Sequence, residues 1–211
     1  MRNSDSSSKD TVTILGVKKQ EFIKSIYNTI TIIHMKNVVL YIAMSLDGYI
    51  ADSKGSVDWI KGQSDSSEMP DTYSPFFKNI DTVILGKRTY DQIITELSPD
   101  EWPYSGATTY VFTHSTSMTD TKDIKFTNAN PCGLIGTLKE ETGKNIWVCG
   151  GADIVNQLMK EDLIDIYHIA IIPVILGGGI RLFDTTDNQI NLRLIETLNY
   201  NGITEVIYES R

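Results

Sequence analysis

Residues 145–152 read Asn-Ile-Trp-Val-Cys-Gly-Gly-Ala, and this stretch decides the fold class. An apolar run over 145–149 favours a β-strand and ends at Gly150-Gly151, after which residues 152–160 follow a helical pattern. Glycine lets the backbone turn sharply or lie close to a ligand, and open α/β sheets build ligand sites at such strand ends. The stretch therefore predicts one strand–loop–helix unit of an α/β enzyme.

Glycine-rich junctions recur along the chain. They read Ser45-Leu46-Asp47-Gly48-Tyr49-Ile50-Ala51, Leu85-Gly86-Lys87-Arg88-Thr89-Tyr90 and Ile172-Pro173-Val174-Ile175-Leu176-Gly177-Gly178-Gly179. Short β-branched or aromatic runs predict strands over 38–43, 82–85, 109–113, 145–149 and 166–172. Helical patterns over 88–96, 133–141 and 152–160 lie between them. This alternation predicts a mostly parallel sheet.

The C-terminal part has a different pattern. Two strands are expected over 192–198 and 203–208, around the turn Asn199-Tyr200-Asn201-Gly202. Because Asn-Gly is a strong hairpin signal, this part is predicted to be antiparallel. Further upstream, Gly143 is the expected C-terminal stop of the helix over 133–141.

The composition of the chain limits the number of domains and the classes of partner. The 211 residues are 41% hydrophobic and 22% charged, enough to bury one sizeable core in one domain. The net charge of -8 argues against nucleic acid as a partner. No apolar run approaches the roughly 20 residues of a membrane span, so a soluble, cytoplasmic protein is expected. Cys132 and Cys149 are not spaced as a zinc or redox pair, which indicates buried thiols and no metal site.

The first 35 residues differ from the rest. Residues 1–10 are polar and rich in serine, and four charged residues interrupt the apolar stretch over 17–34, which removes a signal-peptide core. Met35 directly precedes the first strong strand, so residues 1–35 are interpreted as a loosely attached extension or a start-site artefact, and 36–211 as the domain. An amphipathic helix packing on a partner is the alternative, because Phe22, Ile23, Ile26 and Ile30 share a helical face.

The order of the motifs resembles the dihydrofolate reductase-like superfamily. The motifs are Ser45-Leu46-Asp47-Gly48, Gly86-Lys87-Arg88-Thr89-Tyr90, Gly150-Gly151, and the run from Pro173 to Gly179 followed by Arg181-Leu182-Phe183. Within the superfamily, the chain is most similar to the C-terminal reductase domain of bacterial bifunctional riboflavin-biosynthesis deaminase-reductases and its stand-alone relatives, over residues 36–209. The resemblance implies a three-layer αβα fold, NADPH as cofactor and hydride transfer as the reaction.

Two junctions suit a dinucleotide. Gly86 to Thr89 lies where a strand meets a helix, so free amides, two cations and a hydroxyl could hold a pyrophosphate, although a solvated turn is the alternative. Gly150-Gly151 precedes another helix N-terminus, and the resemblance places Cys149 to Ile154 against the cofactor. It also directs the loop Thr113-His114-Ser115 to the adenosine 2′-phosphate. No arginine stands in that loop, so the choice between NADPH and NADH stays open.

These motifs and the resemblance define one set of expected cofactor-binding residues. The set is Ala43, Ile50, Gly86, Lys87, Arg88, Thr89, Thr113, His114, Ser115, Cys149, Gly150, Gly151, Ala152, Asp153 and Ile154.

The acid that would assist proton transfer is expected near the end of the first strand. Asp47 is the nearest carboxylate and could orient the substrate or relay a proton, while a turn aspartate is the alternative. Asp58, beside Trp59, is a competing acid, and so is Asp71. Trp59 and Asp47 are expected to contact the substrate. Arg181, after the three glycines, could bind a substrate phosphate, with a hairpin or an oligomer contact as the alternatives.

The sequence therefore predicts an NADPH-dependent reductase of a pterin-like or 5-amino-6-(5-phosphoribosylamino)uracil-like small molecule, working as a homodimer. Dihydrofolate reductase is an alternative of the same class, and a nucleotide-binding module without turnover is one of another class. A deaminase is not expected, because Pro131-Cys132 lacks the second cysteine and the H-x-E motif of a zinc deaminase.

Overall fold

The computed structural model describes residues 35–65, 69–186 and 189–211. Its elements are β1 (Val38–Ser45), β2 (Tyr49–Ala51), α2 (Tyr73–Phe77), β3 (Ile80–Gly86), α3 (Lys87–Gln92), a π-helical turn (Ile93–Leu97), β4 (Thr108–Phe112), β5 (Ile124–Thr127), α4 (Pro131–Lys139), β6 (Asn145–Gly150), α5 (Ala152–Lys160), β7 (Ile166–Ile172), β8 (Ile180–Arg181), β9 (Leu192–Tyr200) and β10 (Ile203–Ser210). The interpretation of residues 1–34 as an extension lies outside the described residues. Met35 itself forms a β-bridge with Thr142.

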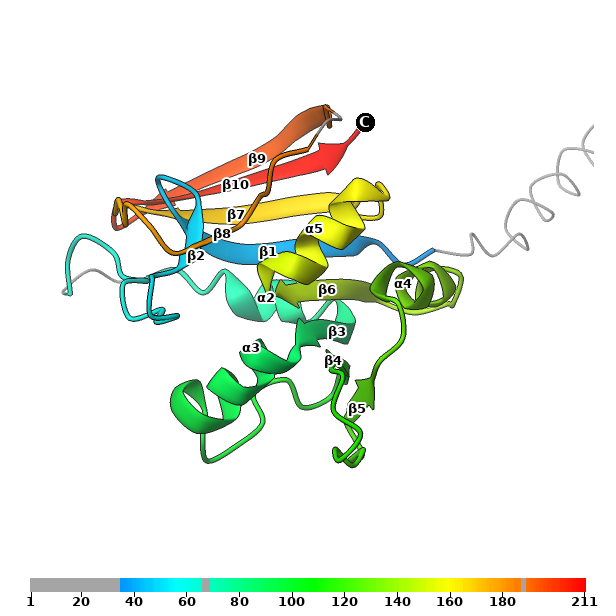
Figure 1. The fold of residues 1–211 in the computed structure, drawn as a ribbon. Helices are drawn as coiled ribbons and strands as arrows, with labels where there is room; N and C mark the ends of the chain where they lie inside the picture. The colour runs from blue at the N-terminus through cyan, green and yellow to red at the C-terminus, as the bar shows by residue number, and fades with distance from the viewer. Residues whose placement is uncertain (1–34, 66–68, 187–188) are drawn as a thin grey trace, which may run out of the picture. The chain divides into compact units, whose positions relative to one another are not determined.

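Eight strands form one sheet in the order β5-β4-β3-β6-β1-β7-β10-β9 (Figure 1). Pairing is parallel from β5 across to β7, whereas β10 runs antiparallel to both β7 and β9. The predicted mostly parallel sheet with an antiparallel C-terminal hairpin is therefore confirmed. A second, two-stranded sheet joins β2 and β8.

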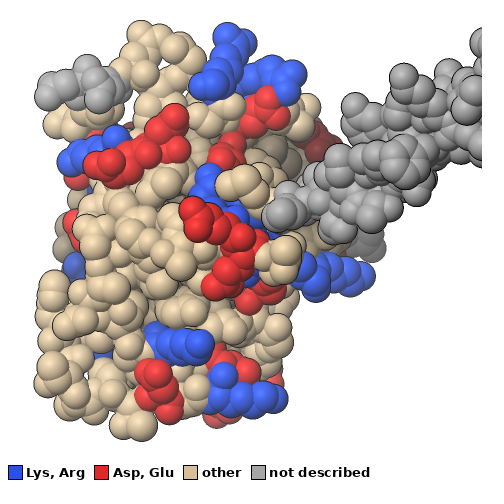
Figure 2. Space-filling view, turned by 90° about the vertical axis from the view of Figure 1, so that its right-hand side faces the viewer, with Lys and Arg blue, Asp and Glu red and all other residues tan. Residues whose placement is uncertain are grey.

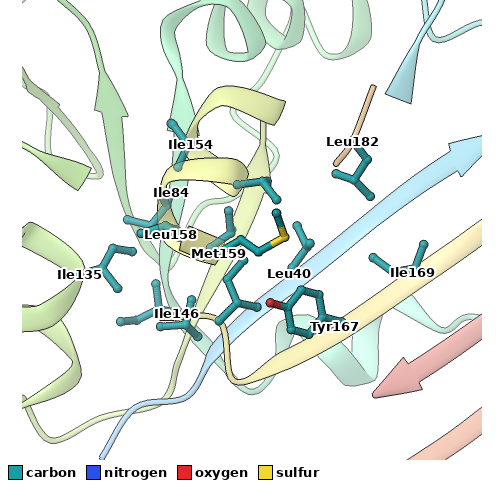
Figure 3. Packing of buried hydrophobic residues seen from close by; sticks show 14 of the residues in the cluster. Leu40, Ile84, Ile135, Ile146, Ile154, Leu158, Met159, Tyr167, Ile169 and Leu182 are labelled. Carbon is teal, nitrogen blue, oxygen red and sulfur yellow. The ribbon is translucent and has the colours of Figure 1, made fainter. Parts of the chain in front are cut away.

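Both faces of the large sheet are covered, which makes three layers. On one face, Leu40 and Ile146 belong to one core cluster with Ile135 of α4 and Leu158 of α5 (Figure 3). Residues of opposite parity, such as Trp147, point to the other face and pack against α2 and the turn after α3. Fully burying one Leu or Ile side chain stabilises the fold by about 1.5–3 kcal/mol. Because both faces of these strands are buried, apolar residues occupy successive positions and form continuous apolar runs.

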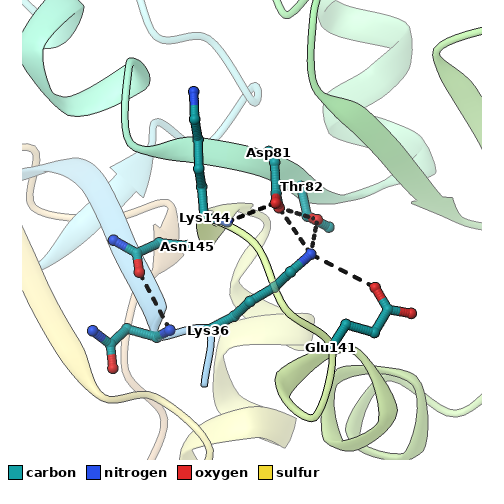
Figure 4. Close-up of polar contacts among 7 residues, drawn as sticks. Lys36, Asp81, Thr82, Glu141, Lys144 and Asn145 are labelled. Carbon is teal, nitrogen blue, oxygen red and sulfur yellow. Dashed lines mark hydrogen bonds and ion pairs between the residues drawn. The ribbon is translucent and has the colours of Figure 1, made fainter. Parts of the chain in front are cut away.

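A buried ion pair lies at the end of the sheet where β1 begins. Lys36 is 5% exposed, and its Nζ lies 2.9 Å from Asp81 Oδ1 and 3.6 Å from Glu141 Oε2 (Figure 4). The backbone amide of Lys144 donates to the other oxygen of Asp81 at 2.7 Å. Burial alone would raise the pKa of Asp81, but hydrogen bonds from Lys144 and Lys36 hold it below its ordinary value. This cluster ties the starts of β1, β3 and β6 together.

Several local predictions need correction. Gly143 does not end a helix, because α4 ends at Lys139, and a Cβ on Gly143 would lie 2.3 Å from Asp81 Oδ2. The glycine is needed for this close approach.

The helix expected over 88–96 is divided into α3 and the π-helical turn Ile93–Leu97. The hairpin turn is confined to Asn201-Gly202, both with positive φ. The elements β2, α2, β5 and β8 are too short or too polar to give a periodic signal.

On the face that Figure 2 shows, basic and acidic side chains are interspersed among uncharged ones. In the described part of the chain, no helix has the length and apolar character needed to cross a membrane.

Candidate active site

A cavity of about 870 Å³ lies at the carboxyl edge of the parallel strands. Ala43 of β1, Gly86 of β3, Phe112 of β4 and Cys149 of β6 all line it. These strands run parallel, so their carboxyl ends reach the same edge of the sheet, where open α/β sheets bind ligands. We call this space the first cavity.

Two helix N-termini meet in the first cavity. Gly86 is the N-cap of α3 and Gly151 is the N-cap of α5, and neither cap offers a side-chain acceptor to the first-turn amides. A Cβ on Gly86 would lie 3.9 Å from Gly151 N, so the two termini are close neighbours. By contrast, α4 is capped by the Asn130 side chain, which accepts from Gly133 N at 3.0 Å. The amides of α3 and α5 are thus free to bind an anion.

The two cations at the start of α3 differ in availability. Lys87 Nζ is held by both carboxylate oxygens of Asp91, at 2.6 and 2.7 Å. Arg88 is exposed, lines the cavity and makes no ion pair with a described residue. Arg88 is therefore the cation that an anionic ligand would meet first.

The thiol of Cys149 also lines the first cavity. Burial raises the pKa of Cys149 to about 11, and its Sγ lies 3.5 Å from the Tyr104 hydroxyl. A thiol with such a pKa stays protonated at neutral pH and is a poor nucleophile. Cys149 therefore lines the cavity without acting as a nucleophile.

The structure brings together almost all of the expected cofactor-binding residues. Those lining the first cavity are Ala43, Ile50, Gly86, Lys87, Arg88, Thr89, Thr113, His114, Cys149, Gly150, Gly151, Ala152, Asp153 and Ile154. Ser115 does not line it, and its hydroxyl lies 2.9 Å from that of Ser117 on the same exposed loop. Their role in holding a cofactor stays a prediction.

The two acids predicted to be catalytic, one of them also predicted to contact the substrate, do not line the first cavity. Asp47 accepts hydrogen bonds from Ser45 Oγ and from the amides of Leu176 and Gly177. Asp58 is exposed and accepts from Ser56 Oγ at 2.9 Å. Among the described residues around the first cavity, neither acid is part of the lining.

Trp59 and Arg181 are also outside the cavity. Trp59 donates from Nε1 to Ser56 O at 3.1 Å and packs against Ile172 and Ile203. The Arg181 guanidinium lies over the Tyr49 ring, 5.0 Å from its centre, as a cation–π pair between β8 and β2. Both side chains are therefore engaged in contacts within the fold.

Sequence reasoning missed the loop over 127–131, which lines the cavity with Asn128, Asn130 and Pro131. It also missed Tyr41 and Trp147. The pair Asn130-Pro131 carried a usable signal, because an asparagine N-cap followed by proline marks the first turn of a helix.

A second cavity of about 340 Å³ adjoins the first and shares Tyr41, Ala43, Ile60 and Trp147 with it. Its polar end is Glu205 of β10, which is 1% exposed. Burial alone would raise the pKa of Glu205, but hydrogen bonds from His168, Tyr200 and Thr72 lower it below its ordinary value. Sequence reasoning missed this acid, although His168 inside the apolar strand β7 is a signal for a buried polar partner.

Comparison with known proteins places the chain in a family of known fold. The family described as the RibD C-terminal domain matches residues 36–204, and the chain belongs to this family. The chain is 42% identical to YwjB of Bacillus subtilis (strain 168), a protein described as uncharacterized, over 82% of this chain and 97% of YwjB. A second B. subtilis protein with the same description, YyaP, is 28% identical over 82% of this chain and 94% of its own length.

Solved structures agree on the fold. A protein of Shewanella sp. PV-4 named for riboflavin biosynthesis has a TM-score of 0.70 and 26% identity, covering 83% of this chain and 99% of that one. The dihydrofolate reductase of Enterococcus faecalis, solved with NADP(H), has a TM-score of 0.56 and 14% identity, covering 83% of this chain and 97% of that one. The predicted similarity to the C-terminal reductase domain of riboflavin-biosynthesis enzymes is thereby confirmed, and the fold is the one that dihydrofolate reductase has.

Proposed function

We propose that the protein is a reductase that uses NADPH to reduce a small heterocyclic molecule, pterin-like or uracil-like. The observation that carries the proposal is the meeting of two uncapped helix N-termini, those of α3 and α5, in the first cavity beside the free cation Arg88. Two sets of free amides and a guanidinium suit the pyrophosphate of a dinucleotide. Family membership and a solved relative with NADP(H) support the same conclusion.

Under this proposal, different residues would bind different parts of the cofactor and the substrate. The amides at the starts of α3 and α5, Thr89 and Arg88 would hold the pyrophosphate, and Thr113 and His114 would lie towards the adenosine. Bound there, the reduced cofactor would supply a hydride. Tyr41, Ala43 and Trp147 line both cavities, so a compound in the second cavity would lie next to a compound in the first. The proposal therefore places the molecule to be reduced in the second cavity.

The test is a titration of NADPH and of NADH into the purified protein, followed by tryptophan fluorescence. Trp147 lines the first cavity, whereas Trp59 lies outside it, so Trp147→Phe should remove most of the quenching and leave binding measurable by calorimetry. Saturable micromolar binding followed by cofactor oxidation with a heterocyclic substrate is expected. If neither dinucleotide binds, the reductase proposal is wrong.

We further propose that the protein is a homodimer that uses the sheet edge at β9. Leu194 and Ile195 are 53% and 52% exposed on this outermost strand. An edge strand with exposed apolar residues is an adhesive surface unless another chain covers it.

A further inference from the structure

The second cavity owes its polar end to four strands that place polar side chains on one face of the sheet. Tyr41 of β1 is the register partner of His168 of β7, and their rings stack with centres 4.0 Å apart. Glu205 of β10 is opposite Ala170, two residues from His168, and Tyr200 of β9 is opposite Ile203, two residues from Glu205. Strand residues two apart share a face, so these side chains converge.

Glu205 is the common hydrogen-bond acceptor of this cluster. Its Oε2 lies 2.6 Å from His168 Nε2. Its Oε1 accepts from Thr72 Oγ1 at 3.0 Å, from Tyr41 Oη at 3.4 Å and from the Tyr200 hydroxyl. Tyr41 Oη also lies 3.1 Å from Thr72 Oγ1, so its proton stays within the cluster with either partner. A phenol has one proton, so Tyr41 and Tyr200 have only lone pairs left for a molecule in the cavity.

Most of the remaining lining of the second cavity is apolar. Trp147, Ala170, Ile172 and Ile203 line it. Among its described lining residues, Glu205 is the one acid and Lys61, which is exposed, the one base. An anionic group inside would approach an ionised carboxylate in surroundings of low dielectric constant, which is unfavourable.

We propose that the second cavity takes an uncharged planar heterocycle that presents ring N–H groups to the oxygens of Tyr41 and Tyr200, and that it selects against a phosphorylated form of that molecule. Glu205 acts here as a positioning residue, since it orients the two hydroxyls. The inference rests on the proposed function, and it narrows the substrate to the unphosphorylated members of the expected class.

The test compares matched ligands by calorimetry, with the protein alone and with NADPH present. The first pair is 5,6-diaminouracil and 5,6-diamino-1,3-dimethyluracil, which lacks the ring N–H groups. The second pair is 5-amino-6-ribitylaminouracil with and without a phosphate ester on the side chain. The wild-type protein should bind the unmethylated ring about 10-fold more tightly than the methylated ring. It should also bind the phosphate ester about 5- to 10-fold more weakly than the free alcohol.

Variants separate positioning from general damage. In Glu205→Gln the phenols are released from a charged acceptor and can donate. Two affinity ratios should therefore fall towards one: that of the unmethylated ring over the methylated ring, and that of the free alcohol over the phosphate ester. Tyr200→Phe should weaken 5,6-diaminouracil about 3- to 10-fold and leave the methylated ring unchanged, which keeps the test decisive if Glu205→Gln does not fold. Glu209→Gln is the control, because Glu209 lies on the same strand, pairs with Arg193 and lines neither cavity.

Equal affinity of the wild-type protein for both rings, tighter binding of the phosphate ester, or no binding of any ring overturns the inference. Binding of 5,6-diaminouracil with the expected preferences, but without binding of NADPH or NADH, would support this inference while overturning the proposed function.

Discussion

The carboxylate of Asp47 accepts a hydrogen bond from the backbone amide of Gly177 at 2.8 Å, across 130 positions of sequence. Its other oxygen accepts from the Leu176 amide at 3.0 Å and from Ser45 Oγ at 2.7 Å. The acid after β1 therefore holds the glycine loop that leads into β8. This arrangement gives Asp47 a structural task, while its predicted catalytic role awaits measurement.

Asp47→Asn should lower stability most at neutral pH. The hydrogen bond from Ser45, helped by the two amides, lowers the pKa of Asp47 despite a smaller opposing effect of burial. A carboxyl whose pKa is lower in the folded state stabilises above its unfolded pKa of about 3.9, and this contribution is lost as the pH falls through the folded value. Urea unfolding of both proteins at pH 7 and at pH 3 checks this. A stability difference that does not shrink at pH 3 contradicts the assignment.

Lys36→Met should destabilise the protein by about 1–3 kcal/mol, less than the roughly 3–5 kcal/mol for breaking a fully buried pair. The smaller loss is expected because Asp81 is 31% exposed and keeps its bond from the Lys144 amide. Lys144→Met is the matched control, since only the backbone of Lys144 contacts Asp81, and its stability should be unchanged. Equal losses in the two variants, measured by denaturant unfolding, would show that the ion pair is not the cause.

Gly150→Ala should lose about 1–3 kcal/mol of stability and bind NADPH more weakly, because Gly150 has a φ of 131°, which L-residues rarely adopt. Gly136→Ala in α4 is the control. Its Cβ would meet nothing within 4 Å, and alanine in a helix should stabilise by about 0.5–1 kcal/mol. Thermal unfolding and fluorescence titration measure both effects. If Gly150→Ala changes neither the stability nor the affinity for NADPH, the backbone at this position does not require glycine.

Arg88→Gln should weaken NADPH binding about 10-fold, the usual loss for a hydrogen bond to a charged group. Lys87→Gln should cost less than about 3-fold, because Asp91 already neutralises Lys87. NADPH titrations of both variants at low and at high salt distinguish the two residues. The loss of affinity in Arg88→Gln should shrink at high salt, because salt screens the charge of Arg88. A larger loss for Lys87→Gln than for Arg88→Gln would reverse the assignment.

Leu194→Glu should convert a dimer into monomers if β9 is the interface, as light scattering after size-exclusion chromatography would show. Ile175→Glu tests the competing idea that the glycine loop makes the contact, since Ile175 is 70% exposed there. Dissociation by Ile175→Glu alone would move the interface to the loop. A monomeric wild-type protein would exclude both.

Much of the fold follows from local patterns. The apolar runs located β1, β3, β4, β6 and β7, and the helix predicted over 152–160 has the observed bounds of α5. The pair Gly150-Gly151 marked the strand–helix junction that lines the first cavity. Such features depend on side-chain periodicity and on backbone freedom, which neighbouring residues alone determine.

The roles of the acids depended on tertiary structure. The sequence predicted Asp47 and Asp58 as the catalytic candidates, yet loop amides bind Asp47, and Asp58 is exposed. No local pattern marked Glu205, although the strand order places its carboxylate 2.6 Å from His168, 37 positions away. The sequence by itself determined which segments form strands and helices and where glycine is required. Only the tertiary structure decided which carboxylate is buried and which groups surround it, because sheet register between distant segments sets those contacts.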